Sequence, residues 1–281
     1  MAQKSVIPCL LSAETSKRIG DYADALAAGA HSLGDHGLSR EEFEQSGLLR
    51  AAIERLRGRQ AASMTDKREF IAAKLKIMQQ EGAIAAWSFS GSADRHDYEV
   101  RMPNGRVCAI EAKGCLDGNN TNIFERPPHA DEFLIWSLCQ NPGANPRHNV
   151  WSGIHTRLSA ETIHRKVHVD ALIVWDMLCG SAGRPCPKLE AGFKEPPPCL
   201  YLFPRSVSDP RNNPSPPPRQ VEEVSFVAAL MKTFSCQQSS LNQVQIESKY
   251  ENNALMRRTT IVRNGEEQKQ SRWTELRRAG R

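Results

Sequence analysis

The stretch that decides the fold of this chain is HDYEVRMPNGRVCAIEAKG, residues 96–114. Apolar and charged residues alternate along its first half, as they do in a strand with one buried face. The turn signal Pro103-Asn104-Gly105 follows, and the alternation resumes after it. Residues 97–114 therefore predict a β-hairpin.

Three side chains of this hairpin carry the candidate chemistry. Glu111 and Lys113 are two residues apart on one strand, so both point to the same face. Asp97 opens the preceding strand, and hairpin pairing brings it beside them. Two converging carboxylates repel one another unless a divalent cation joins them, and a neighbouring lysine orients and helps deprotonate a metal-bound water. These are the groups that attack on a phosphodiester requires.

The spacing of an acid two residues before a lysine is not specific by itself, because it occurs three times, at Glu111, Glu247 and Glu267. Glu111 differs in its context, which combines an upstream Asp, a hairpin, a preceding helix, and a following helix and buried strand. The alternative interpretation is a solvated hairpin whose charges form cross-strand ion pairs.

The sequence around the hairpin predicts a layered α/β arrangement. Residues 65–82 predict a helix that ends near Gly82, and residues 83–91 predict a short strand. Residues 130–140, ADEFLIWSLCQ, suggest a short helix that Pro142 and Pro146 end.

A second helix and a buried strand follow. Residues 158–168 predict a helix with Ser159 as its N-cap, and VDALIVWDML, residues 169–178, predicts a buried strand. From Thr65 to Leu178 the predicted order is thus helix, strand, strand, strand, helix, strand.

Extensions surround this core. Residues 1–62 predict a helical extension, with one helix over 39–58 that Ser39 caps. Residues 63–235 form the predicted core, which includes a loop over 184–218 that holds eleven of the seventeen prolines and a strand-like CLYLFP. A helix, VEEVSFVAALMKTF, ends the core. Residues 236–281 predict a basic extension with a strand, VQIESKY, and an arginine-rich tail over residues 253–281. This tail either grips DNA phosphates or forms a solvated helix such as RWTELRRAGR.

The segment from about Thr65 to Leu178 resembles the core of the PD-(D/E)xK nuclease superfamily, to which most type II restriction endonucleases belong. That core runs αβββαβ in a mixed sheet flanked by helices, with a metal-binding Asp opening the second strand and E-x-K on the third. The resemblance implies that Asp97 and Glu111 hold Mg²⁺, which Mn²⁺ can replace, and that Lys113 assists the attacking water.

The match leaves some positions open. His96 stands where the family has a proline, and Asp94 or Glu99 is the upstream metal ligand if the register differs by two or three residues. Some family members use a glutamate from the first helix, for which Glu81 is the nearest candidate.

The resemblance implies a Mg²⁺-dependent endonuclease that cuts double-stranded DNA as a homodimer, in the manner of a type II restriction enzyme. The alternatives are a DNA-binding protein with a nuclease-like fold and no catalysis, and a repair or transposition nuclease. Arg126 and His129, after the Lys113 strand, and Arg257 and Arg258, in the basic tail, are the candidate DNA contacts. Arg126 and His129 are equally well explained as loop residues before a helix.

Composition sets limits without naming a function. The 281 residues include 37 Lys plus Arg and 32 Asp plus Glu, so the net charge of +5 permits a polyanionic partner and does not require one. The 40% hydrophobic and 25% charged residues exclude a wholly disordered or fibrous chain. Eight cysteines without a CxxC pair favour reduced thiols, and no apolar run is long enough for a signal peptide or membrane span. We therefore expect a cytoplasmic protein.

Overall fold

The structure is a computed structural model that describes residues 13–27, 64–91, 96–114, 116, 125–140, 145–180, 186, 196–207 and 216–276. Three features of the sequence lie outside these residues: the predicted helix over 39–58, the alternative ligand Asp94, and most of the proline-rich loop. The described residues have a mixed α/β fold, as expected.

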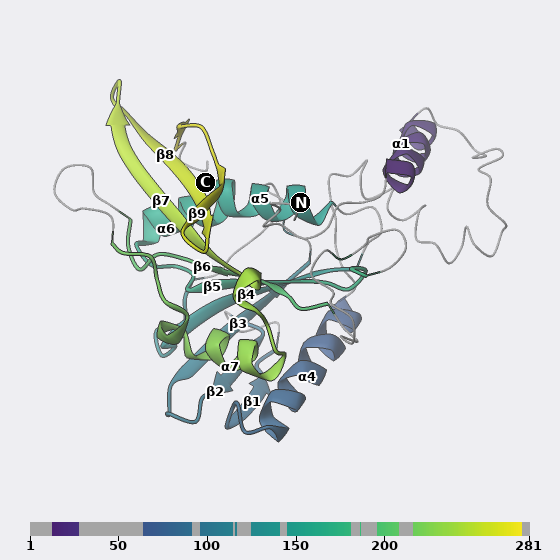
Figure 1. Ribbon diagram of the computed structural model, residues 1–281, viewed down its shortest axis with the longest axis vertical. Coiled ribbons are helices and arrows are strands. Elements are labelled where there is room, and N and C mark those ends of the chain that lie inside the picture. The colour runs from purple at the N-terminus through teal and green to yellow at the C-terminus, as the bar shows by residue number, and fades with distance from the viewer. Residues whose placement is uncertain are drawn as a thin grey trace.

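One ten-stranded sheet runs through the molecule in the order β1-β2-β3-β4-β5-β6-β7-β8-β10, with β9 paired to β8 (Figure 1). The strands are β1 Ala86–Phe89, β2 Tyr98–Arg101, β3 Val107–Lys113, β4 Glu132–Cys139, β5 Ala171–Asp176, β6 Cys199–Leu202, β7 Leu241–Glu251, β8 Ala254–Arg263, β9 Glu266–Gln270 and β10 Thr274–Glu275. The helices are α1 Ala13–Ala27, α4 Met64–Gln80, α5 Pro146–Ser152, the π-helical η1 Gly153–Leu158, α6 Ser159–Arg165, α7 Ser225–Thr233 and the 3₁₀ turns η2 Val221–Glu223 and η3 Gln238–Ser240.

The predicted hairpin is confirmed. Strands β2 and β3 pair antiparallel, with Tyr98 opposite Ile110. Gly105 closes the turn with φ +83°, a conformation that glycine adopts without steric cost. The first predicted helix is also confirmed as α4, which ends before Gly82 at φ +70°.

The helix predicted over 130–140 is wrong, because this segment is β4. All eight of its residues are buried, and it pairs parallel with β3 on one side and β5 on the other. Leu134 and Trp136 pack on one face of the sheet while Phe133 and Ile135 pack on the other. A strand covered on both faces has no alternation, so its apolar run cannot be told from a buried helix by periodicity.

The start of the next helix was also predicted wrongly. The helix begins at Pro146, with Asn145 as N-cap accepting a hydrogen bond from the His148 N–H, so Pro146 opens a helix instead of ending one. Ser159 is inside the helical run with φ −64° and ψ −39°, and its hydroxyl donates to the Ile154 carbonyl at 2.6 Å. It is therefore not a cap.

The C-terminal segment continues the sheet. The predicted strands at CLYLFP and VQIESKY are confirmed as β6 and β7, and the predicted helix between them is α7. The described start of RWTELRRAGR contains the short strand β10 in place of a helix, because it pairs with β8 through Thr274 and Arg257.

Among the cysteines that the structure describes, Cys139 differs from the expectation. Cys139, the last residue of β4, is disulfide-bonded. The expectation that the cysteines are reduced thiols is therefore wrong for this residue. Cys108 is a fully buried thiol on β3.

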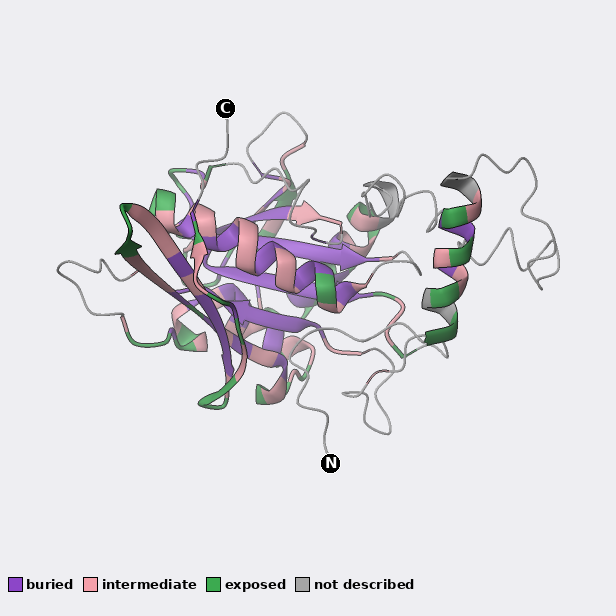
Figure 2. Ribbon diagram, turned by 90° about the horizontal axis from the view of Figure 1, so that it is seen from above, coloured by how far each residue is buried: buried purple, intermediate pink, exposed green. Residues whose placement is uncertain are grey.

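Two layers of helix cover the sheet (Figure 1). Helices α4 and α7 lie on one face, which we call the α4/α7 face, and α5, η1 and α6 lie on the other, the α5/α6 face. The central strands are buried along most of their length, whereas β7 becomes exposed and β8 partly exposed towards their shared turn (Figure 2). Among the described residues, no helix is both long enough and apolar enough to cross a membrane.

Candidate functional site

The structure brings Asp97, Glu111 and Lys113 together at the carboxyl end of β3. Extending the β2–β3 register by one pair beyond Tyr98 and Ile110 places Asp97 opposite Glu111, where Cβ atoms are about 4.5–5.5 Å apart. The Asp97 N–H donates to the Ile110 carbonyl at 3.0 Å, and the Asp97 carboxylate accepts from the Ala112 N–H at 2.8 Å. The carboxylate of Asp97 is thus fixed against the backbone between Glu111 and Lys113.

Glu111 is the buried member of this group. Its side chain lies on the α5/α6 face and the residue is 4% exposed. Lys113 Nζ lies 2.5 Å from Glu111 Oε1. Burial raises the pKa of Glu111 even though the Lys113 ammonium lowers it, and the Asp97 carboxylate raises it further. A cation bound between these two carboxylates would lower the pKa of Glu111.

Lys67 is a fourth member that the sequence did not single out. It lies in the first turn of α4, and its ammonium interacts electrostatically with Asp97, Lys113 and Glu111. The Tyr98 hydroxyl donates to the Arg68 carbonyl at 3.2 Å, which fixes this end of α4 over β2. Burial lowers the pKa of Lys67, and the Asp97 carboxylate opposes that shift. The sequence offers one signal for it, a basic residue in the helix before the hairpin, whereas the family resemblance points only to an acid in that helix.

Glu81, the candidate acid from the first helix, lies at the opposite end of α4. It is exposed and follows the last helical residue. The separation of fourteen positions between Lys67 and Glu81 corresponds to about 20 Å along a helix axis. Glu81 is therefore remote from Asp97 and Glu111.

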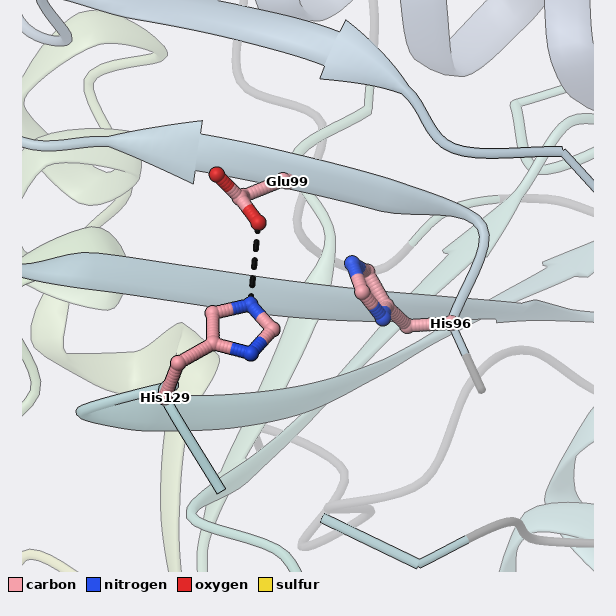
Figure 3. Close-up of side chains that lie close together, drawn as sticks. All are labelled: His96, Glu99 and His129. Carbon is pink, nitrogen blue, oxygen red and sulfur yellow. Dashed lines mark hydrogen bonds and ion pairs between the residues drawn. The ribbon is translucent and has the colours of Figure 1, made fainter. Parts of the chain in front are cut away.

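A second cluster lies next to the first, and Figure 3 shows its three side chains. His129 Nε2 lies 2.9 Å from Glu99 Oε2, and one potential ligand atom from each of His96, Glu99 and His129 lies within 4.8 Å of the others. His96 is buried, Glu99 is half-buried and His129 is exposed. Glu99, the alternative upstream ligand, and His129, a candidate DNA contact, thus belong to this cluster.

The three arginines chosen as candidate DNA contacts are paired within the fold. Arg126 Nη1 lies 2.8 Å from the buried Asp170 carboxylate. Arg257 is 6% exposed and donates to the Thr156 carbonyl. Arg258 Nε lies 2.7 Å from Glu247 Oε2. These contacts hold the loop before β4, the helix η1 and the strand β7 in place.

The two clusters suit different cations. Carboxylate oxygens such as those of Asp97 and Glu111 are ligands for hard cations, including Mg²⁺, whereas imidazole nitrogens suit transition metals.

Comparison of the chain with protein families, curated proteins and solved structures found no match in any of the three. The geometry of these side chains is therefore the basis for assigning a function.

Proposed function

We propose that the protein is a Mg²⁺-dependent DNA endonuclease of the PD-(D/E)xK type, which hydrolyses phosphodiester bonds in double-stranded DNA as type II restriction enzymes do. The observation that carries this proposal is the convergence of Asp97, Glu111 and Lys113 at the end of β3. We also propose that it is a cytoplasmic homodimer; the homodimer and double-stranded DNA as the substrate are what the family resemblance of these residues implies.

The order of elements supports the proposal for the first half of the core. Helix α4 and strands β1, β2 and β3 follow the family's α-β-β-β order, with Asp97 just before β2 and Glu111 on β3. The second half differs by one strand. Strand β4 pairs parallel with β3, and the helical run α5 to α6 follows β4 and leads to β5, again parallel. The difference leaves the hairpin that carries the three residues unchanged.

The donor set fits a divalent cation. Asp97 and Glu111 offer hard carboxylate oxygens, and burial of Glu111 raises its pKa, which a bound cation would reverse. The formal charges of Lys67, Asp97, Glu111 and Lys113 sum to zero, so a divalent ion makes the site +2. Attack by hydroxide on a phosphodiester concentrates two negative charges at phosphorus, which this charge matches.

Each of the four residues of the site has a role in this scheme. Asp97 and Glu111 would hold Mg²⁺, with Asp97 oriented by the Ala112 N–H. When bound, the ion would stabilise the charge that develops on the phosphoryl group and would acidify a water. Lys113, whose ammonium is on the same face as Glu111, orients the attacking water. Lys67 reduces the repulsion between the two carboxylates and the DNA phosphate.

The experiment is cleavage of several plasmid DNAs by purified protein with Mg²⁺. We expect discrete fragments from the wild type and none from Lys113→Ala. The matched control is Lys249→Ala, because Lys249 follows Glu247 in the same acid-x-Lys spacing, and it should cleave as the wild type does. No cleavage by metal-replete wild type, or equal cleavage by Lys113→Ala and Lys249→Ala, contradicts the proposal.

The same preparation separates the alternatives. DNA binding without cleavage, together with no Mg²⁺ uptake that depends on Asp97 and Glu111 in calorimetry, would indicate a non-catalytic binder. Cutting that follows the structure of the DNA and not its sequence would indicate a repair or transposition nuclease.

A further inference from the structure

We propose that His96, Glu99 and His129 form a second metal site, separate from the carboxylate pair, that binds a divalent transition-metal ion of the Zn²⁺ class. The site draws its ligands from two parts of the chain. His96 precedes β2, Glu99 is on β2, and His129 lies in the loop before β4 (Figure 3). The proposal stands independently of the nuclease activity.

The spacing of the three groups is close to what a metal needs. All three potential ligand atoms lie within 4.8 Å of one another. Bonds of about 2.0–2.1 Å in a tetrahedral site put ligand atoms about 3.4 Å apart. The pair formed by His129 and Glu99 is already closer than that, at 2.9 Å. Side-chain rotations that move the ligand atoms by about 1.4 Å or less therefore bring them to tetrahedral spacing.

A simple ion pair between His129 and Glu99 does not explain the third residue. His96 is 7% exposed, yet its ring centroid lies 5.8 Å from that of His129, with the planes inclined at 59°. The rings are thus tilted and not stacked. The Ser90 hydroxyl lies 3.2 Å from His96 Nε2 and holds the buried ring in its orientation. Fixing a ligating imidazole through a second hydrogen bond is typical of metal sites.

The ligand types select the class of metal. Two imidazoles with one carboxylate are the protein ligands of several zinc enzymes, in which a fourth position remains for water. Mg²⁺ favours oxygen ligands, so it should prefer the Asp97 and Glu111 carboxylates. The increase in exposure from His96 through Glu99 to His129 leaves that fourth position on the solvent side.

Occupancy of this site would affect the neighbouring carboxylates through the backbone. Asp97 lies between His96 and Glu99 in the sequence, but its carboxylate accepts from the Ala112 N–H. A metal that joins Glu99 to His129 cross-links the start of β2 to the loop before β4. It therefore restricts the backbone of Asp97 without being bound by Asp97.

The test uses metal-stripped full-length protein, titrated with Co²⁺ as a spectroscopic substitute for Zn²⁺, and then with Zn²⁺ by calorimetry. A large excess of Mg²⁺ is present to occupy the carboxylate pair, and the titration is run at a pH of about 7.5, above the ordinary pKa of free histidine. We expect one Co²⁺ per chain, with visible d–d bands and no thiolate-to-cobalt charge-transfer band.

Substitutions identify the ligands. His129→Ala and Glu99→Gln should each weaken Co²⁺ binding at least about tenfold, because even outer-shell partners of metals contribute that much. His148→Ala, at an exposed histidine on α5, is the matched control and should bind as the wild type does. Because His129 is exposed, its replacement should leave the circular dichroism spectrum unchanged. Glu111→Gln should retain the Co²⁺ spectrum, which separates this site from the nuclease group.

Two results would overturn the proposal. One is a wild type that binds no Co²⁺ in the presence of Mg²⁺, or that binds it only with thiolate bands. The other is a His129→Ala variant whose Co²⁺ affinity and spectrum equal those of His148→Ala.

Discussion

The two faces of the sheet are made by alternate residues of the same strands, yet they differ in chemistry. On the α4/α7 face, β3 and β4 contribute Ile110, Leu134 and Trp136 to a buried apolar cluster. On the α5/α6 face, β3 contributes Glu111 and Lys113, which lie beside a second buried apolar cluster that includes Phe133 and Ile135. The period of two in a strand thus lets β3 place its charged side chains on one face while apolar packing extends over both faces of the sheet. Substitutions on the two faces should separate these effects.

The largest expected effect is on the charged face. Glu111→Gln should lower the single-turnover rate of DNA cleavage about 1,000-fold, equivalent to about 4 kcal/mol, because it removes a carboxylate of the proposed metal site. The free energy of unfolding in urea should change by less than about 1 kcal/mol, since burial raises the pKa of Glu111 and the uncharged amide relieves that cost. Glu247→Gln is the control. A large stability loss with retained cleavage would reverse the assignment of this face.

The next effect belongs to the apolar face. Trp136 is fully buried on β4 and its ring is parallel to that of Trp175, with centroids 6.1 Å apart. Trp136→Ala should reduce the free energy of unfolding in urea by about 3–5 kcal/mol through the cavity it leaves. Phe89→Ala, at a residue that is 40% exposed, should cost less than about 1 kcal/mol. Equal losses for both would show that burial of Trp136 on the α4/α7 face does not contribute to stability as proposed.

A third substitution tests whether every charge on the α5/α6 face serves chemistry. Asp170 is buried, pairs with Arg126 at 2.8 Å and Arg219 at 2.6 Å, and accepts from the Phe133 N–H. Asp170→Asn should cost about 3 kcal/mol of unfolding free energy, since it leaves a buried guanidinium without a counter-charge. Wild-type stability in this variant would contradict a structural role for the Asp170 carboxylate.

A smaller effect is expected at Lys67, which reaches the charged group from α4. Lys67→Met should slow cleavage about tenfold, or about 1.4 kcal/mol, because it removes one of two positive charges near the carboxylates. Lys76→Met, at an exposed position of the same helix, is the control and should cleave at the wild-type rate. Cleavage at the wild-type rate by the Lys67 variant would exclude it from the site.

The smallest effect is a pH dependence on the α5/α6 face. Burial lowers the pKa of His155, and Arg257 and Lys269 lower it further. The unfolded chain, where histidine has a pKa of about 6.5, therefore binds this proton more readily than the folded one. Unfolding free energy should fall, by about 1 kcal/mol or less, as the pH drops from about 7 to 5. His155→Gln should flatten the slope, and His148→Gln, at an exposed histidine, should leave it unchanged.

The sequence predicted the parts of this fold that depend on local signals. The β2–β3 hairpin followed from alternation and the Pro-Asn-Gly turn, and the proximity of Asp97 to Glu111 followed from the hairpin. Strand β4 was missed because both of its faces are buried, so it carries no periodic signal. Whether residues 132–139 form a helix or a strand depends on the neighbouring strands β3 and β5, which lie elsewhere in the sequence.

The remaining members of the site depend on contacts between distant segments. Lys67 joins the carboxylates only because the first turn of α4 lies over the start of β2. Glu99 and His129 were each given a separate role, as an alternative ligand and a DNA contact. Their contact arises because the loop before β4 returns to β2, thirty residues away in the sequence, and spacing alone does not encode that return.

The order of strands in the sheet has a consequence for how the protein is made. From β1 to β8, each strand is hydrogen-bonded to the strand that precedes it in the chain. Each pairing therefore closes only one connecting segment, which keeps the entropic cost of each step small. The sheet can grow strand by strand as the polypeptide leaves the ribosome, and the hairpin with Asp97 and Glu111 is complete before the strands from β4 to β10 have been synthesised.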